Sequence, residues 1–243
     1  MKPCTPNFKK IAKVVTPRRL ELKMAYAVQE LSFVKKTLLL SNLRFRKAYP
    51  TRKVNSLYFD NSTFSAIEDS LSGTSNRTKI RLRWYGGLDK AIKPVLEFKL
   101  KQGQLSWKKL YSTSLKLNPN PDNWMDAFAC ISNDLGEQTI RNILPSTHSI
   151  PISLISYSRE YYESFGGLIR ATIDQDLTYR DQTLSPRPNF EIKRKSSNKL
   201  ILELKLAKQN LNSLGNITQH LKFIPQRFSK YCESALQHRG KWR

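Results

Sequence analysis

The chain has 243 residues, with 42 Lys or Arg against 19 Asp or Glu, which gives a formal net charge of +23. Hydrophobic residues make up 39% of it, which is the composition of a folded domain and excludes a disordered basic tail. The charge predicts a polyanionic partner: nucleic acid, polyphosphate, nucleotides or an anionic membrane.

The cysteines and the apolar runs predict a cytoplasmic protein. Cys4, Cys130 and Cys232 are widely spaced and contain no C-x-x-C pair, so they fit neither a disulfide framework nor a zinc site. No apolar run approaches the roughly 18 residues of a membrane span. The first ten residues lack the apolar stretch of a signal peptide. We therefore expect a reducing compartment and no integral membrane segment.

The predicted elements are mostly strands. Residues 1–17 are expected to be a basic lead-in, and residues 18–243 a single folded domain. Period-two alternation of apolar and polar residues predicts strands, and apolar residues at helical spacing predict helices. We expect strands over 18–26, 53–60, 78–85, 95–101, 105–115, 152–163, 168–177 and 200–206, and helices over 28–43, 61–71, 124–144 and 228–237.

Local features sharpen three of these expectations. Lys35 and Lys36 are expected on the solvated face of the first helix. Asn61 or Ser62 should cap the second helix, since both residue types favour N-caps, and a glycine at 73 should end it. The Pro- and Lys-rich residues 185–197 are expected to form an exposed loop.

Two predicted strands carry cations on one face. Residues 78–87 alternate strictly, so that Ile80, Leu82 and Trp84 share one face of the strand. The opposite face holds Lys79, Arg81, Arg83 and Tyr85, and the strand that follows has Glu97, Lys99 and Lys101 on one face. Neighbouring cations repel one another unless an anion lies among them. The pattern therefore indicates either a polyanion site or a solvated sheet face.

A Glu-x-Lys pattern recurs on three predicted strands, each time on the face opposite the apolar one. It occurs at Glu21/Lys23, Glu97/Lys99 and Glu203/Lys205. If the sheet closes into a barrel, these faces point into one lumen, and phosphates would neutralise its cations through strong charge-assisted contacts. Each glutamate could either neutralise a neighbouring lysine or hold Mg²⁺ or Mn²⁺, which prefer carboxylate and phosphate oxygens.

Familiar catalytic motifs are missing from the sequence. It contains no G-x-S-x-G, H-E-x-x-H, Walker A or G-x-G-x-x-G pattern. His148, His220 and His238 are scattered and have no metal-ligand spacing. Chemistry, if present, is therefore expected on the charged strand faces.

Taken in order, these motifs resemble the VTC (vacuolar transporter chaperone) domain, the polyphosphate polymerase branch of the triphosphate tunnel metalloenzymes. The more specific pieces are Arg-x-Arg-Trp-Tyr-Gly at 81–86 and Phe-Ser-Lys-Tyr at 228–231. The other matching segments are 19–23, 56–60, 96–99, 157–161, 170–174 and 202–205. The resemblance implies an α+β fold, an antiparallel β-barrel that encloses a basic tunnel and is braced by helices.

The resemblance also implies roles for residues. Transfer of the γ-phosphoryl group of ATP to a growing polyphosphate chain would be carried by Arg81, Arg83, Lys99 and Lys205. The substrate phosphates would also be gripped by Lys23, Arg159, Arg170, Ser229 and Lys230. Glu203 matches the metal-ligand glutamate, with Glu21 as a second ligand for Mn²⁺ or Mg²⁺. The expected partners are thus ATP and polyphosphate.

One departure from the wider superfamily bears on the reaction. The tunnel hydrolases begin with Glu-x-Glu-x-Lys, whereas Arg19 stands here in the place of the first glutamate. One carboxylate fewer argues against two-metal activation of water and favours the polymerase branch. The alternatives are a triphosphatase for inorganic triphosphate or nucleotides, and a binding module for polyphosphate or nucleic acid. General nucleic-acid binding would spread charge over a surface, so no specific nucleic acid is expected.

Overall fold

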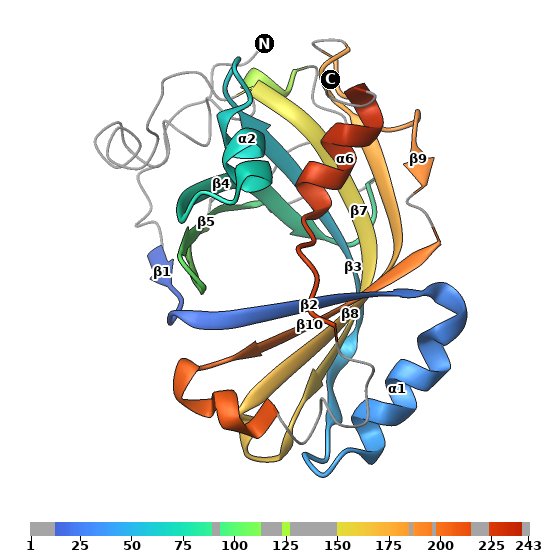
Figure 1. Ribbon diagram of the computed structural model, residues 1–243. Coiled ribbons are helices and arrows are strands. Elements are labelled where there is room, and N and C mark those ends of the chain that lie inside the picture. The colour runs from blue at the N-terminus through green and yellow to red at the C-terminus, as the bar shows by residue number, and fades with distance from the viewer. Residues whose placement is uncertain are drawn as a thin grey trace.

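The computed structural model describes residues 13–88, 93–112, 123–126, 150–184, 187–195, 198–214 and 224–239. Within these ranges the chain is built around one antiparallel sheet that curls around a central space (Figure 1). Its strands are β1 (Lys13–Val15), β2 (Arg19–Ala27), β3 (Arg46–Asp60), β4 (Asn76–Tyr85), β5 (Val95–Gln102), β6 (Leu105–Ser112), β7 (Ile150–Glu163), β8 (Ile169–Asp181), β9 (Arg194–Lys195) and β10 (Lys199–Leu206). The α-helices are α1 (Leu31–Leu40), α2 (Ser65–Ser72) and α6 (Lys230–Arg239), and the short 3-10 helices are η1 (Val28–Glu30), η2 (Phe165–Gly167) and η3 (Lys208–Leu214).

The sheet closes on itself. Neighbouring strands follow the order β6, β2, β10, β8, β7, β3, β4, β5, and β5 pairs again with β6, so eight strands of the described chain form a barrel. The seam between β2 and β6 is short, with Arg19 opposite Ser106 and Leu20 opposite Leu105. β1 continues along the same strand, β6, beyond this seam. The predicted antiparallel β-barrel is confirmed.

Strand alternation decides what each face of the barrel contacts. On the outer face, apolar side chains of β2, β8 and β10 form a core that α1 covers with Val34 and Leu38. Another outer core gathers around Trp84 and Trp124, whose ring centroids lie 6.3 Å apart. Because the outer face takes up the apolar residues, the charged ones are left on the inner face, as the period-two pattern predicts.

Two helices cover part of the inner face. Tyr231 of α6 stacks on Tyr58 of β3, with ring centroids 4.8 Å apart, and its hydroxyl donates to Asp60 at 2.8 Å. The Asp60 carboxylate in turn accepts the amide protons of Ala66 and Ile67 at the start of α2. This chain of contacts fixes α2 and α6 against the barrel strands. It also brings the start of α6 to the central space (Figure 1).

Several predicted boundaries need correction. Residues 13–15, assigned to the lead-in, form β1 because they complete backbone pairing with β6. The helix expected over 28–43 is divided into η1 and α1 and ends at Leu40, since the backbone at Ser41 is extended (φ −64°, ψ 151°). The strand expected from residue 53 already begins at Arg46.

The predicted local features agree with the structure only in part. The helix expected from residue 61 begins only at Ser65, and Phe64, not Asn61 or Ser62, is at its N-cap position. Asn61 still accepts the amide proton of Ser65 at 3.0 Å, and Gly73 ends α2 with φ +81°, as predicted. Lys35 is not simply solvated, because its ammonium contacts the Glu160 carboxylate at 2.6 Å. The expected loop over 185–197 contains β9, which pairs with β8. Of the helix expected over 124–144, only 124–126 lie among the described residues. No helix among the described residues is long and apolar enough to cross a membrane.

Candidate active site

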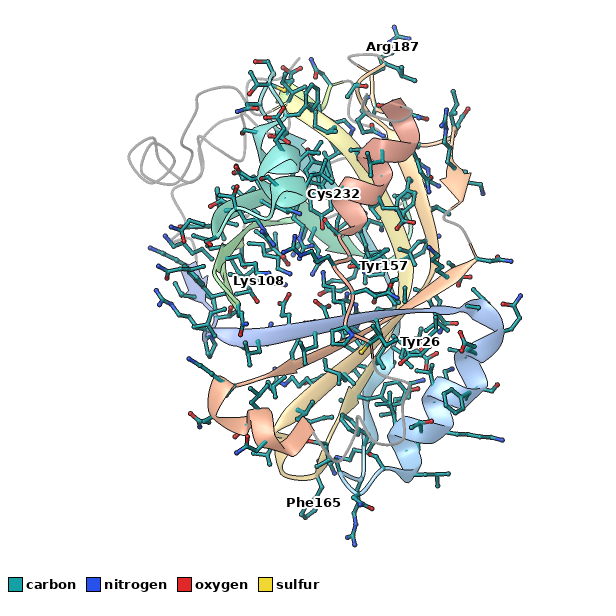
Figure 2. All side chains as sticks on the ribbon, viewed as in Figure 1. Tyr26, Lys108, Tyr157, Phe165, Arg187 and Cys232 are labelled. Atoms are coloured by element: carbon teal, nitrogen blue, oxygen red, sulfur yellow. The ribbon has the colours of Figure 1, made fainter. Side chains whose placement is uncertain are left out.

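The inner faces of the strands enclose a cavity of about 630 Å³. Figure 2 labels Lys108 of β6, Tyr157 of β7 and Cys232 of α6 around it, and nitrogen atoms crowd the space between β2, β4 and β5. Twelve cationic side chains line the cavity: Lys23, Arg77, Lys79, Arg81, Arg83, Lys99, Lys101, Lys108, Arg159, Lys205, Arg227 and Lys230. Among described residues only two acidic side chains do so, Glu21 and Glu203. Such an imbalance favours a multiply charged anion inside.

One wall of the cavity, formed by β4 and β5, is organised by arginines. Arg81 donates to Glu97 through Nε at 2.8 Å and to the hydroxyl of Tyr58 at 2.7 Å. Arg83 lies with Nη1 3.3 Å from Glu97 and donates to the hydroxyl of Tyr157 at 3.1 Å. These contacts fix both guanidinium planes. We call Arg81, Arg83 and Glu97 the arginine wall.

Glu97 is saturated with cations. Besides both arginines, Lys108 approaches its carboxylate at 3.4 Å. Burial alone would raise the pKa of Glu97, but Arg81, Arg83 and Lys108 hold it well below its usual range. Of the two roles that the sequence left open for the Glu-x-Lys glutamates, Glu97 therefore has that of counter-charge.

The facing wall, formed by β2 and β10, carries the other two Glu-x-Lys pairs. In the strand register Glu203 lies opposite Lys23, and Lys205 lies opposite Glu21. Lys205 approaches Glu203 at 2.9 Å, and Lys99 of β5 reaches across the lumen to Glu21 at 2.5 Å. We call Glu21, Lys23, Glu203 and Lys205 the glutamate wall.

The electrostatics of this wall keep both glutamates ionised. Burial would raise the pKa of Glu21, but the charges of Lys99, Lys205 and Lys23 together outweigh it and lower the pKa to about 2. Burial likewise opposes ionisation of Glu203, and Lys205 and Lys23 hold its pKa well below the usual range. Two anionic carboxylates thus face the cavity from adjacent strands.

These two carboxylates fit a divalent metal bound jointly with substrate. They are hard oxygen donors at diagonal positions on neighbouring strands, two residues apart in register. Within the described ranges no group of three or more His, Cys, Asp or Glu side chains gathers as a metal site. Glu21 and Glu203 would therefore hold Mg²⁺ or Mn²⁺ with substrate phosphates supplying further oxygens, an arrangement that suits Mg²⁺ in particular.

A third group of contacts joins β7 and β8 to the start of α6. Arg159 forms a paired contact with the buried Asp174, with distances of 2.5 and 2.7 Å. Lys230 contacts the same carboxylate at 2.6 Å. Ser229 accepts a hydrogen bond from Lys79 at 2.8 Å. α6 thus delivers Ser229 and Lys230 into the cavity beside Arg159.

Burial disfavours the charged form of four lysines in the cavity. Burial lowers the pKa of Lys23 to about 7, with the charge of Lys99 adding to it. Burial also lowers the pKa of Lys79 and Lys205, and it lowers that of Lys108 well below the usual range. A bound phosphate would raise these pKa values again, because an anion nearby favours the ammonium.

Ten of the eleven predicted site residues line this cavity, and Arg170 does not. Arg170 lies opposite Lys205 in the register, but its side chain is 64% exposed and contacts Glu163 at 3.3 Å. It is the second residue of β8, close to the end of the strand, where it pairs with Lys205 of β10 and Glu163 of β7. The expectation that Arg170 lines the tunnel is therefore corrected.

Sequence reasoning missed several lining residues. Lys108 is adjacent to Lys109, so alternation alone could not say which faces inward. Tyr58 and Tyr157 resemble ordinary core aromatics in sequence, although both bond to an arginine of the site. Arg227 lies in a stretch before α6 with no periodic pattern.

A family model named VTC domain matches residues 14–238, which is nearly the whole chain. This chain belongs to the VTC domain family. With the closed barrel and its basic lumen, membership supports a tunnel-type enzyme and implies dependence on a divalent metal in general. No curated protein matches the sequence.

Two solved structures resemble this VTC domain distantly. The PH1819 protein of Pyrococcus horikoshii OT3 is 14% identical, with a TM-score of 0.46, over 91% of this chain and 99% of that one. A Hippeastrum protein described as an adenylyl cyclase candidate with a dominant triphosphatase activity is 13% identical, with a TM-score of 0.47, over 93% of this chain and 97% of that one. Neither likeness bears on the chemistry of the present cavity.

Proposed function

We propose that this VTC domain is a polyphosphate polymerase that transfers the γ-phosphoryl group of ATP to a growing polyphosphate chain. The observation that carries the proposal is the lumen itself, in which twelve cations and only two carboxylates among the described residues surround one cavity. An anion with many charges spaced along a chain matches this arrangement better than a single phosphate does. The proposal extends to ATP as the donor and to Mn²⁺ or Mg²⁺ as the metal.

In the proposed reaction a terminal phosphate oxygen of the acceptor chain attacks the γ-phosphorus of ATP. A new P–O bond forms, the bond to the β-phosphate oxygen breaks, and ADP leaves with that electron pair. Phosphoryl transfer needs little covalent chemistry from a protein, so positioning and charge stabilisation suffice. Arg81 and Arg83, oriented by Glu97, Tyr58 and Tyr157, would stabilise the charge on the transferred group.

The lysines and the metal would divide the remaining work. Lys205 of the glutamate wall and Lys99, which reaches Glu21 in that wall, would neutralise phosphates in line with the transferred group. Lys23, Arg159, Ser229 and Lys230 would hold the rest of the substrate. When bound, the divalent metal would neutralise phosphate charge next to Glu21 and Glu203.

The composition of the cavity favours transfer to phosphate over transfer to water. Arg19, in the place of a hydrolase glutamate, is not among the lining residues, so the β2 strand contributes one carboxylate, Glu21. A single pair of glutamates offers little for activating a water through two metals. A triphosphatase remains the alternative outcome of the test.

The test is incubation of the protein with ATP and Mn²⁺, followed by sizing of the phosphate products on a gel. Long phosphate chains are the expected product. Free phosphate without long chains would show that the protein hydrolyses triphosphates. If neither product forms, the protein is a phosphate-binding module. The Arg83→Lys variant, which preserves charge, serves as the matched control for activity from a contaminating enzyme.

A further inference from the structure

Beyond the phosphate cavity, the inner barrel face continues into a cluster of tyrosines. Along β4 the inward row runs Arg77, Lys79, Arg81, Arg83 and then Tyr85. Along β7 the row of Tyr157 and Arg159 continues two residues later with Tyr161. Two residues on a strand span about 7 Å. Both rows of phosphate-gripping residues therefore end in an aromatic side chain.

Arg52 of β3 joins these rows. It lies opposite Arg159 in the register, and its guanidinium carbon is 5.6 Å from the ring centroids of Tyr49 and Tyr85 and 5.9 Å from that of Tyr161. Tyr49 and Tyr161 meet edge to face with centroids 5.8 Å apart. We call Tyr49, Arg52, Tyr85 and Tyr161 the aromatic rim.

The aromatic rim is open to ligands. Tyr49 is 57% exposed and Tyr85 is 51% exposed, so part of each ring is accessible. Arg52 is exposed as well. The other end of the β4 row is different. Arg77 lies there opposite Lys101, and Arg227 also lines the cavity. Among the described residues, the tyrosines that line the cavity are Tyr58 and Tyr157. The two ends of the β4 row thus differ, with Arg77 near Lys101 at one end and Tyr85 in the exposed aromatic rim at the other.

From this asymmetry we infer that the aromatic rim binds the nucleobase of the nucleoside triphosphate whose phosphates enter the lumen. Tyrosine rings and an arginine plane are the groups on which bases stack in single-stranded nucleic-acid sites, and every base has a π face to offer. The rim adjoins Arg83 and Arg159, so a ligand that joins a base to a triphosphate can occupy both regions at once. Inorganic phosphate chains have no ring that could stack on the aromatic rim.

The inference rests on the proposed function, because it requires a nucleotide as the phosphate donor. It can nevertheless be tested by measuring binding alone. The dissociation constants of AMP-PNP and of inorganic triphosphate are measured by calorimetry, with Mn²⁺, for wild type, Tyr85→Ala and Tyr49→Ala. Removing a stacking ring should weaken AMP-PNP binding at least about fivefold. Binding of inorganic triphosphate should stay within about twofold of wild type, because its charges meet only the lumen.

Two variants control the experiment. Tyr85→Phe keeps the ring and should restore AMP-PNP affinity. Phe165→Ala removes a 76% exposed aromatic from η2, away from the cavity lining, and should change neither ligand. Equal weakening of both ligands, or of neither, by the alanine variants would overturn the inference. If wild type makes no polyphosphate yet the two ligands respond differently, the polymerase proposal fails and the nucleobase site stands.

Discussion

The arginine wall and the glutamate wall start from the same Glu-x-Lys pattern but put their carboxylates to different use. Glu97 sits behind Arg81 and Arg83 and is not among the cavity-lining residues. Glu21 and Glu203 do line the cavity and are matched mainly by lysines. Glu203 contacts three cations, Lys205, Arg159 and Lys23, as Glu97 contacts Arg81, Arg83 and Lys108. Exposure to the cavity, and not the number of cationic neighbours, is therefore what leaves Glu21 and Glu203 available to a metal.

The largest expected effect is loss of turnover in Glu203→Gln. The amide keeps the shape of the side chain but cannot act as an anionic metal ligand, and Lys205 loses its closest counter-charge. We expect conversion of ATP into acid-insoluble phosphate to fall to background while circular dichroism shows a folded protein. Metal-dependent activity retained in this variant would transfer the ligand role to Glu21.

The same substitution on the facing wall should act on stability. In Glu97→Gln the guanidinium groups of Arg81 and Arg83 and the ammonium of Lys108 stay buried with less counter-charge. Breaking a buried ion pair by removing one partner typically costs roughly 3–5 kcal/mol of unfolding free energy. Urea unfolding measures this loss, and inorganic triphosphate should recover part of it by supplying the missing anion. A Glu97→Gln protein as stable as wild type would refute the counter-charge role.

Next in size is the effect of Arg83→Lys on catalysis. Lysine preserves the charge but cannot reproduce the fork that contacts Ser56, Tyr157 and Glu97 together. Lost transition-state contacts of this kind cost about 3–4 kcal/mol, a rate loss of order 10²–10³. Steady-state turnover of ATP into acid-insoluble phosphate is the measurement.

The control for this variant is Lys36→Ala, because Lys36 is exposed on α1. Lys35, equally plausible from the sequence, is a poorer control since it contacts Glu160. Wild-type turnover in Arg83→Lys, or an equal loss in Lys36→Ala, would place the chemistry outside the lumen.

The smallest predicted effect is a pH dependence from Lys23. Its ammonium faces Lys99, Glu203, Glu21 and Lys230 and donates to the carbonyl of Phe228 at 3.0 Å. With its pKa lowered to about 7, Lys23 is charged below that pH and neutral above it. Since phosphate prefers the ammonium, kcat/KM should fall about tenfold as pH rises through 7.

The variant Lys23→Arg separates this titration from that of the substrate. Arginine stays protonated, so the decline in kcat/KM should move to higher pH. An unchanged pH profile in Lys23→Arg would mean that another group governs the decline.

The barrel and most of the cavity could be predicted because strands with one apolar and one charged face leave few choices. Once the sheet closes, Glu203 and Lys205 must share a lumen with Arg81 and Arg83, whatever the loops do. Arg170 follows the same alternation but does not line the cavity. It is at the beginning of β8, where its side chain contacts Glu163. Alternation fixes the face of a residue but not its depth along the lumen.

Other features lay beyond sequence reasoning for a different reason. One of the three cations that contact Glu97 is Lys108. Because Lys108 and Lys109 are adjacent in β6, the sequence could not show which of them faces the lumen. The aromatic rim combines residues from β3, β4 and β7 and needs a register shift between Tyr49 and Arg52. Such bulges come from the pairing of whole strands, which no local pattern encodes.

The division between the two walls is tested most directly by the affinity for inorganic triphosphate in EDTA, without metal, measured by calorimetry. Glu203→Gln removes an anion from a cationic lumen and should bind triphosphate at least as tightly as wild type. Arg83→Lys loses a fixed donor fork and should bind it about tenfold more weakly. Opposite changes in the two variants are the result that our account predicts. Weaker binding in Glu203→Gln, or unchanged binding in Arg83→Lys, would contradict it.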